Sequence, residues 1–354
     1  MKMKLSTVIN PNEKRVAITP ETAAKYIKLG LNVVLPKGVG ESAGFADSEY
    51  EACGAVITES DINDVNLYVC VKPVLSENME LSKGSYLIAM LSPFQNEEVL
   101  KKLFLRGINP CALEKIPRIT RAQSMDILSS QANIAGYRAV IEAMSEYCRV
   151  IPLMMTAAGT VRPARILVLG AGVAGLQAIA TAKRMGARVS AFDVRRAAKE
   201  QVESLGASFV DVESDENGET VGGYAREMSE DYKKKQAEKL KEALKKSDIV
   251  ISTAQIQGKP APRLITKEMV YGMAAGSVIV DMATETGGNC ELSKRDQKVV
   301  VNGVTIVGYT DFAGRVAYDS SQLFARNVFN FVSLMLKDNK LDTSDEIIQA
   351  TLIN

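Results

Sequence analysis

Residues 166–175 read Ile-Leu-Val-Leu-Gly-Ala-Gly-Val-Ala-Gly. The four apolar residues at the front are typical of a strand that is buried on both faces, and the glycines after them have the spacing G-x-G-x-x-G. Residues 173–185 then have the periodicity of a helix. In such a strand–turn–helix unit, Gly170 permits a tight turn, Gly172 leaves room for a pyrophosphate, and Gly175 lets the helix pack closely on its strand. This stretch therefore predicts a nucleotide-binding α/β unit.

A dinucleotide is the ligand that this unit is expected to take. The helix N-terminus at Val173 and Ala174 offers backbone N–H groups and the positive end of the helix dipole to phosphates. A second strand ends at Asp193, 18 residues beyond the last glycine, where a carboxylate accepts hydrogen bonds from the adenosine ribose and repels a 2′-phosphate. NAD(H) is therefore favoured over NADP(H), although Arg195 and Arg196 follow closely and weaken this preference. The alternative is a glycine-rich turn that binds no ligand.

Strands and helices alternate along the whole chain, which predicts parallel sheets built from βαβ units. The expected fold class is α/β, with two Rossmann-like doubly wound parallel-sheet lobes that are joined by long helices and leave a cleft between them. We expect the first lobe to comprise residues 1–130 and 320–354, and the second residues 131–319. A connecting helix is expected over residues 122–148, and a helix over residues 320–336 would return the chain to the first lobe.

The expected strands are short and apolar. In the first lobe they cover residues 4–10, 33–35, 67–71 and 86–91. In the second lobe they cover residues 166–169, 189–193, 208–212, 249–253, 278–281 and 304–307.

One segment departs from this alternation. Residues 213–246 carry many charges and few large apolar side chains. They fit a solvated loop followed by a surface helix. They fit equally a mobile flap over about residues 213–240, which would carry Tyr224 and Met228 toward a site.

Composition excludes several classes of function. The 354 residues include 43 Lys and Arg against 42 Asp and Glu, and the formal charge of +1 gives no reason to expect nucleic acid as a partner. The five cysteines are widely spaced without a C-x-x-C pair, which argues against a metal site or a disulfide framework and for a reducing, cytoplasmic compartment. No apolar leader follows Met1, and the uncharged run 166–182 is too short and too rich in glycine to span a bilayer. Direct membrane insertion is therefore not expected.

The chain contains no histidine. Any mechanism that relies on imidazole as a general base, proton shuttle or metal ligand is therefore excluded. Chemistry that needs only positioning of the reactants is compatible with this composition.

Several stretches resemble a known family. Residues 118–138 read RITRAQSMDILSSQANIAGYR, and they are similar to a signature of the NAD(H)-binding component of proton-translocating nicotinamide nucleotide transhydrogenases. The similarity spans nearly the whole chain. It includes the glycine turn and residues 154–161, 199–206, 222–228 and 285–290.

The resemblance implies an activity and a set of partners. In this family, hydride passes directly from NADH to NADP⁺, and the NADP(H) is held by a separate domain of membrane-embedded subunits, with coupling to proton translocation. The chain would be a homodimer in which a hairpin near residues 149–161 reaches the partner subunit. It would lie in the cytoplasm, peripheral to the inner membrane through those partner subunits.

The resemblance also implies roles for individual residues. Those that hold and orient the nicotinamide would be Arg118, Gln123, Asp126 and Ser129. Those that bind the rest of the dinucleotide would be Gly170, Gly172, Val173, Ala174, Gly175, Asp193, Val194, Ala254 and Gln255, with Tyr224 and Met228 on the mobile loop. Gln255 and Gln257 stand where the family more often has leucine and proline.

Two other functions stay open. Residues 12–20 and 71–73 resemble regions in which alanine dehydrogenases, of the same fold family, keep an arginine and a lysine for their substrate, here Arg15 and Lys72. Those enzymes use a histidine as acid and base, whereas transfer between two nicotinamides requires no proton donor. The third possibility is a non-catalytic NAD(H)-sensing module. Taken alone, a charged residue such as Asp126 is more simply interpreted as part of an ordinary ion pair.

Overall fold

The chain divides into two compact units. The computed structural model describes residues 2–212, 229–256, 259–337 and 340–353. One unit comprises Met1–Gln131 and Ala313–Asn354, and the other comprises Ala132–Phe312. The chain enters the second unit within helix α4 (Ile127–Glu146) and leaves it shortly before helix α9 (Ala317–Met335).

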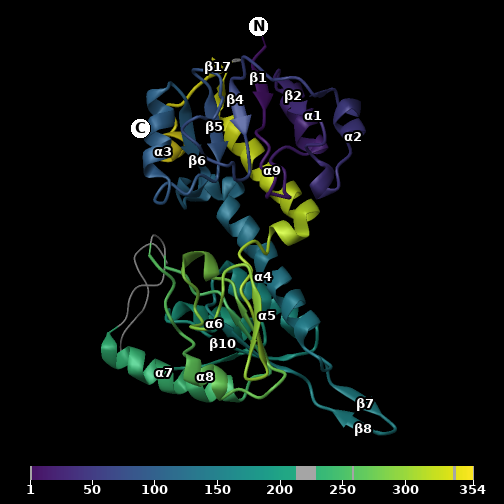
Figure 1. The fold of residues 1–354 in the computed structure, drawn as a ribbon, viewed down its shortest axis with the longest axis vertical. Helices are drawn as coiled ribbons and strands as arrows, with labels where there is room; N and C mark the ends of the chain where they lie inside the picture. The colour runs from purple at the N-terminus through teal and green to yellow at the C-terminus, as the bar shows by residue number, and fades with distance from the viewer. Residues whose placement is uncertain (1, 213–228, 257–258, 338–339, 354) are drawn as a thin grey trace. The chain divides into compact units, whose positions relative to one another are not determined.

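The first unit contains a sheet of six parallel strands in the order β3-β2-β1-β4-β5-β6 (Figure 1). This is the strand order of a Rossmann fold. The strands are β1 (Lys4–Ser6), β2 (Asn32–Pro36), β3 (Val56–Thr58), β4 (Leu67–Val69), β5 (Tyr86–Ala89) and β6 (Asn109–Ala112).

Helices cover both faces of this first sheet. The apolar cluster on one face includes residues of α1 (Pro20–Lys28), α2 (Asp47–Ala52), α9 and α10 (Glu346–Thr351), and the cluster on the other includes α3 (Glu97–Leu105). Along β4, Leu67 and Val69 belong to the first cluster and Tyr68 to the second. This alternation follows from the two-residue period of a strand and leaves both faces buried.

The second unit contains a sheet of seven strands in the order β11-β10-β9-β12-β13-β15-β14, of which β14 pairs antiparallel. The strand order reverses between β9 and β12, so these two neighbours form the topological switch point. The strands are β9 (Arg165–Leu169), β10 (Arg188–Phe192), β11 (Ser208–Phe209), β12 (Ile249–Ser252), β13 (Val278–Asp281), β14 (Lys298–Val301) and β15 (Val304–Val307).

The central strand β9 is buried on both faces, as its apolar run predicted. Ile166 and Val168 pack toward α4, α5 (Val173–Arg184) and α6 (Ala197–Ser204). Leu167 and Leu169 pack toward α7 (Glu230–Lys245) and α8 (Lys267–Tyr271). All four side chains are 1% exposed or less. The predicted fold class, two α/β units with parallel sheets, is therefore confirmed.

Three elements differ from those that the sequence predicts. The strand expected over residues 4–10 ends at Ser6, because the N–H of Val8 donates to Cys70 Sγ at 3.3 Å instead of continuing the sheet. The helix expected over residues 122–148 is a 3₁₀ helix, η3 (Thr120–Met125), followed by α4. Strand β14 was not predicted. It is joined to β15 by a two-residue turn in which Asn302 and Gly303 have φ of 51° and 76°, as the Asn-Gly pair at this position favours.

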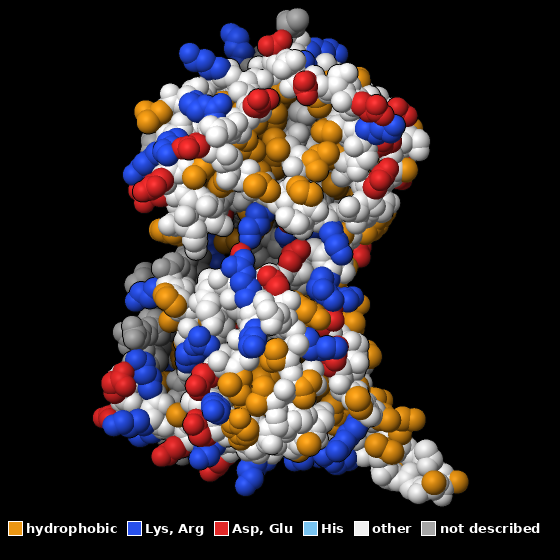
Figure 2. Space-filling view, in the orientation of Figure 1, with side chains coloured by type: hydrophobic (Ala, Val, Ile, Leu, Met, Phe, Trp, Pro, Cys, Tyr) orange, Lys and Arg blue, Asp and Glu red, His pale blue; other side chains and the backbone are white. Residues whose placement is uncertain are grey.

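A hairpin projects from the second unit. Its strands are β7 (Met154–Thr156) and β8 (Gly159–Val161), and all six of their residues are exposed. Met155 and the preceding Leu153 are 79% and 57% exposed. Figure 2 shows hydrophobic side chains along this hairpin and around its base. The base is fixed by Asp248, whose carboxylate accepts two hydrogen bonds from Arg162, each of 3.1 Å.

The closest packing in the second unit is between the ends of β9 and α5. A β-carbon at Gly175 would lie 1.8 Å from the carbonyl oxygen of Gly170. Both atoms belong to the backbone, so a side chain at this position forces α5 away from its strand. A β-carbon at Gly172 would instead meet no atom within 4 Å.

We expect Gly175→Ala to lower the free energy of unfolding by about 1–3 kcal/mol, the usual cost of overpacking. Gly172→Ala is the matched control, because its φ of −77° suits alanine and the space beside it is open. Thermal unfolding followed by circular dichroism measures both variants. Equal melting temperatures for the two variants would contradict this account of the junction.

Candidate functional site

The glycine turn of the second unit lies at the carboxyl end of β9, beside β12. In open α/β sheets, ligands bind outside the carboxyl ends of the strands where the strand order reverses. Gly170 has a φ of 96°, which favours glycine, and Thr253 Oγ1 donates to its carbonyl oxygen at 3.0 Å. The sequence prediction of a tight turn at this strand end is therefore confirmed.

The start of α5 fits a pyrophosphate. Gly172 is the N-cap residue, no side chain caps the helix, and its first turn contains no acidic residue. The first N–H groups of a helix have no acceptor within the helix, and they carry its positive dipole end. Any side chain at Gly172 would enter the open space beside these groups. Val173 and Ala174, at the first turn, thus have the chemistry expected of phosphate ligands.

Asp193 directly follows β10 and is fixed to the glycine turn. Its side chain is 6% exposed, and its Oδ2 accepts the N–H of Ala171 at 2.7 Å. The next residue, Val194, packs partly buried against the apolar cluster under α7 and α8. The carboxylate lies at the strand end that the spacing predicted. The sequence did not reveal that Arg195 also binds it.

The loop after β12 is held in place by Asn289. This amide is fully buried, its Oδ1 accepts the hydroxyl of Ser252 at 2.6 Å, and its Nδ2 donates to the carbonyls of Ala254 and Pro262, both at 2.8 Å. Asn289 therefore fixes the loop that carries Ala254 and Gln255. Sequence reasoning assigned Asn289 no role, since a polar residue after two glycines is typical of any turn.

Three residues of interest lie outside the described residues. They are Tyr224, Met228 and Gln257. Of the segment in which the first two lie, the structure describes α7, which agrees with the expected surface helix but does not test the flap.

The four residues expected to hold a nicotinamide lie on one short segment of the first unit. Arg118 precedes η3, Gln123 lies within it, and both are exposed. Asp126 caps α4: its Oδ1 accepts the N–H of Ser129 at 2.9 Å and its Oδ2 accepts the Ser129 hydroxyl at 2.6 Å. The structure therefore brings Asp126 and Ser129 into direct contact. The capping bond also explains why α4 begins after residue 126.

Helices distant in sequence hold this segment. From α9, Asn327 and Asn330 donate to the carbonyl of Ser124 at 2.8 and 3.1 Å. At the start of α10, Asp345 and Glu346 bind the guanidinium of Arg121. These contacts join residues more than 200 positions apart, for example 203 for Asn327 and Ser124, so no local pattern could predict them.

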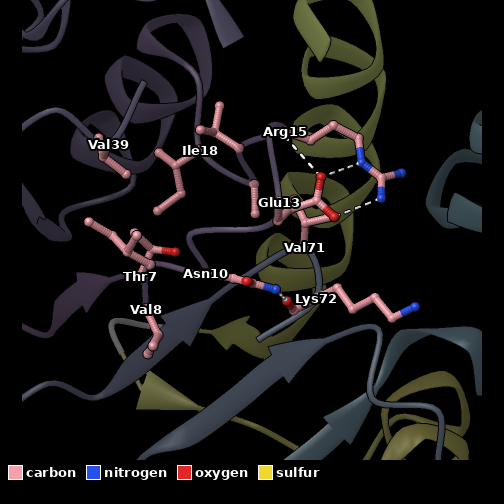
Figure 3. A pocket seen from close by; sticks show the side chains of 12 residues that line it. Thr7, Val8, Asn10, Glu13, Arg15, Ile18, Val39, Val71 and Lys72 are labelled. Atoms are coloured by element: carbon pink, nitrogen blue, oxygen red, sulfur yellow. Dashed lines mark hydrogen bonds and ion pairs between the residues drawn. The ribbon is translucent and has the colours of Figure 1, made fainter. Parts of the chain in front are cut away.

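The first unit has a pocket at the carboxyl ends of β1 and β4, its own switch point (Figure 3). Arg15 and Lys72 both line it. Arg15 Nε and Nη2 each bind the Glu13 carboxylate at 2.8 Å, and Nη1 binds Gln131 at 2.8 Å. The Arg15 and Glu13 side chains are 7% and 8% exposed, so this charge is balanced inside the protein.

Acid–base groups are scarce around this pocket. The chain has no histidine. Burial raises the pKa of the Cys70 thiol, which contacts Thr7 and Val8, to about 11, so the thiol is neutral at pH 7.

Neither a metal site nor a membrane span is found in the ranges that the structure describes. These ranges contain no cluster of three or more His, Cys, Asp or Glu side chains that could hold a metal ion. Nor does any helix in the described part of the chain have the length and hydropathy to cross a membrane.

Comparison with known proteins places both units in one family. The family models for alanine dehydrogenase/PNT match residues 7–135 with the N-terminal domain and residues 139–354 with the C-terminal domain. An NAD(P) transhydrogenase subunit alpha of Rhodospirillum rubrum is 48% identical over 368 aligned residues, which cover 100% of this chain and 96% of the relative. The crystal structure of transhydrogenase from Sinorhizobium meliloti superposes with a TM-score of 0.90 at 45% identity, covering 99% of this chain and 98% of that one.

A more distant relative has a different name. Alanine dehydrogenase of Halomonas elongata is 30% identical over 344 residues, which cover 94% of this chain and 86% of the relative. With both domains matched and near-complete coverage of the transhydrogenase subunit, the chain belongs to the alanine dehydrogenase/PNT family.

Proposed function

We propose that this chain is the NAD(H)-binding subunit of a proton-translocating NAD(P) transhydrogenase. The observation that carries the proposal is the open, uncapped start of α5 at Gly172, which suits a pyrophosphate. The 48% identity to a transhydrogenase subunit over the full chain, against 30% to an alanine dehydrogenase, supports the choice of reaction. NADP(H) would be held by a domain of membrane-embedded partner subunits, with which this chain associates at the cytoplasmic side.

The second unit would bind most of the dinucleotide. The pyrophosphate would lie at Gly172, where the N–H groups of Val173 and Ala174 donate to it. Asp193 would accept the hydroxyls of the adenosine ribose. Ala254 and Gln255 would contact the dinucleotide from the loop that Asn289 holds.

The nicotinamide end would be oriented by Arg118, Gln123, Asp126 and Ser129. The Ser129 hydroxyl donates its proton to Asp126, so its oxygen stays available as an acceptor for an amide N–H. Bound NADH supplies the hydride, and the transfer needs no proton from the protein. The chain's own task is therefore positioning, which can lower a barrier by roughly 7–11 kcal/mol when reacting atoms are held about 3–3.5 Å apart.

Reductive amination of a keto acid is the alternative, since Arg15 and Lys72 line a pocket in the first unit. That reaction must move protons as well as hydride. The absence of histidine and the pairing of Arg15 with Glu13 both disfavour it.

Reconstitution tests the proposal. The purified chain is mixed with membranes or a domain that supplies the NADP(H) site, and reduction of acetylpyridine adenine dinucleotide by NADPH is followed by absorbance. We expect turnover only when both components are present. Rapid oxidation of NADH by this chain alone with pyruvate and ammonia would reject the proposal in favour of a dehydrogenase. Tight NADH binding without turnover in the mixture would favour a sensing module.

In the same assay, Gln123→Asn should slow hydride transfer at least about tenfold, a loss of roughly 1.4 kcal/mol of transition-state stabilisation, because the shorter amide misplaces the ring. The Kd for NADH, measured by fluorescence titration, should change far less. Thr120→Ser, a conservative change at the start of the same 3₁₀ helix, is the control and should leave both quantities near wild type. A large loss of affinity with normal turnover would contradict the orienting role of Gln123.

Gly172→Ala should weaken NADH binding about tenfold, equivalent to roughly 1.4 kcal/mol, because the methyl group enters the phosphate space. Isothermal titration calorimetry gives the affinity. The melting temperature of the same variant should stay at the wild-type value, which separates loss of the ligand space from unfolding. Wild-type affinity in this variant would exclude the turn as the pyrophosphate site.

We also propose that the chain is a homodimer and that the hairpin of β7 and β8 packs on the second copy. Its exposed Leu153 and Met155 support this, because a projecting two-stranded ribbon is rarely stable without a partner surface. Met155→Asp should shift the molecular mass measured by light scattering from dimer to monomer. Val300→Asp, at a residue that is 66% exposed on β14, should leave the dimer intact. An unchanged mass for Met155→Asp would argue against the hairpin as the contact.

A further inference from the structure

The carboxylate of Asp193 already has a full set of hydrogen bonds within the chain. Its Oδ1 accepts the backbone N–H of Arg195 at 2.8 Å and the Arg195 Nε at 2.9 Å. Its Oδ2 accepts the N–H of Ala171 at 2.7 Å and the Arg195 Nη2 at 2.9 Å. A carboxylate offers about four acceptor positions. Two of them are used by backbone groups, and the other two are used by one guanidinium.

We propose that Arg195 is a displaceable occupant of the ribose site and that it lowers the selectivity of this chain for NAD(H) over NADP(H). This inference rests on the proposed function, since it assumes that Asp193 accepts the adenosine ribose. The guanidinium presents two N–H donors to the two carboxylate oxygens, as the 2′- and 3′-hydroxyls of a ribose would present two O–H donors. Both sets of donors need the same two acceptor positions, so they compete.

The backbone contacts explain how the site survives this exchange. When the guanidinium leaves, Asp193 still accepts the N–H groups of Ala171 and Arg195, so its side chain keeps its place beside the glycine turn. The Arg195 side chain is 20% exposed and therefore has a route to solvent. Its contact with Asp193 spans only two positions in sequence, whereas the Ala171 contact joins two strand ends. Arg195 therefore adds little to the fold at this carboxylate.

The charge of Arg195 acts on selectivity in one direction. A bare carboxylate repels a 2′-phosphate, and this repulsion is how such a site rejects NADP(H). While Arg195 binds Asp193, the pair is neutral and the repulsion is reduced. Once displaced, the guanidinium is a suitable partner for a phosphate. Removal of Arg195 should thus strengthen NADH binding and weaken NADPH binding.

The test uses the wild-type chain and the variants Arg195→Leu and Arg196→Leu, with Kd values for NADH and for NADPH measured by calorimetry. We expect Arg195→Leu to bind NADH about threefold to fivefold more tightly, the change that follows from removing one partly exposed ion pair. Its affinity for NADPH should fall by at least a similar factor. Arg196 lies beside it, is exposed, and carries the same charge, so Arg196→Leu should move both Kd values less than twofold.

A second variant guards against a folding defect. Arg195→Lys keeps the charge but replaces the two-pronged contact with a single ammonium, and it should bind NADH more tightly than wild type while retaining the wild-type affinity for NADPH. Weaker or unchanged NADH binding in both Arg195 variants overturns the proposal, and so does an equal effect from Arg196→Leu. If the wild-type chain binds neither dinucleotide, the proposed function itself fails. If it binds NADH and Arg195 has no influence, only this inference fails.

Discussion

At the junction of β9 and α5, the carbonyl oxygen of Gly170 occupies the place that a β-carbon of residue 175 would need. The helix can therefore begin directly against the end of the strand, and its first N–H groups open onto the space beside Gly172. Two neighbouring strand ends are attached to the same turn, through Thr253 to the Gly170 carbonyl and through Asp193 to the Ala171 N–H. What we propose for the dinucleotide depends on this contact between two pieces of backbone.

The two units have the same order of their first strands but differ in chemistry at the switch point. In the second unit, glycine leaves the switch point open. In the first unit, the corresponding pocket contains Arg15, whose charge is matched by Glu13 of the same chain. The fold thus supplies two equivalent positions, and the side chains on the loops decide which one suits a phosphate. The loops, and not the sheets, therefore indicate the function.

Much of the fold could be predicted because burial leaves a signature in the sequence. The strand at Ile166–Leu169 is apolar at every position, since helices cover both of its faces. Strand β6 was missed because it begins Asn109-Pro110, which is unusual in a strand and tolerated here at the end of the hydrogen-bonded strand order. The positions of Gly170 and Asp193 followed from spacing. The Arg195 contact could not, because a pair two residues apart depends on the local backbone path.

The tie between Arg121 and α10 has a practical meaning. Asp345 and Glu346 grip η3, the 3₁₀ helix that contains Gln123, and further along the chain Leu352 forms an antiparallel bridge with Cys111 on β6. A purification tag, a linker or a deletion introduced after residue 344 would pull on both places at once. Such an alteration could then impair turnover while the glycine turn of the other unit stays intact, and a loss of activity would be mistaken for a defect in the cofactor cradle.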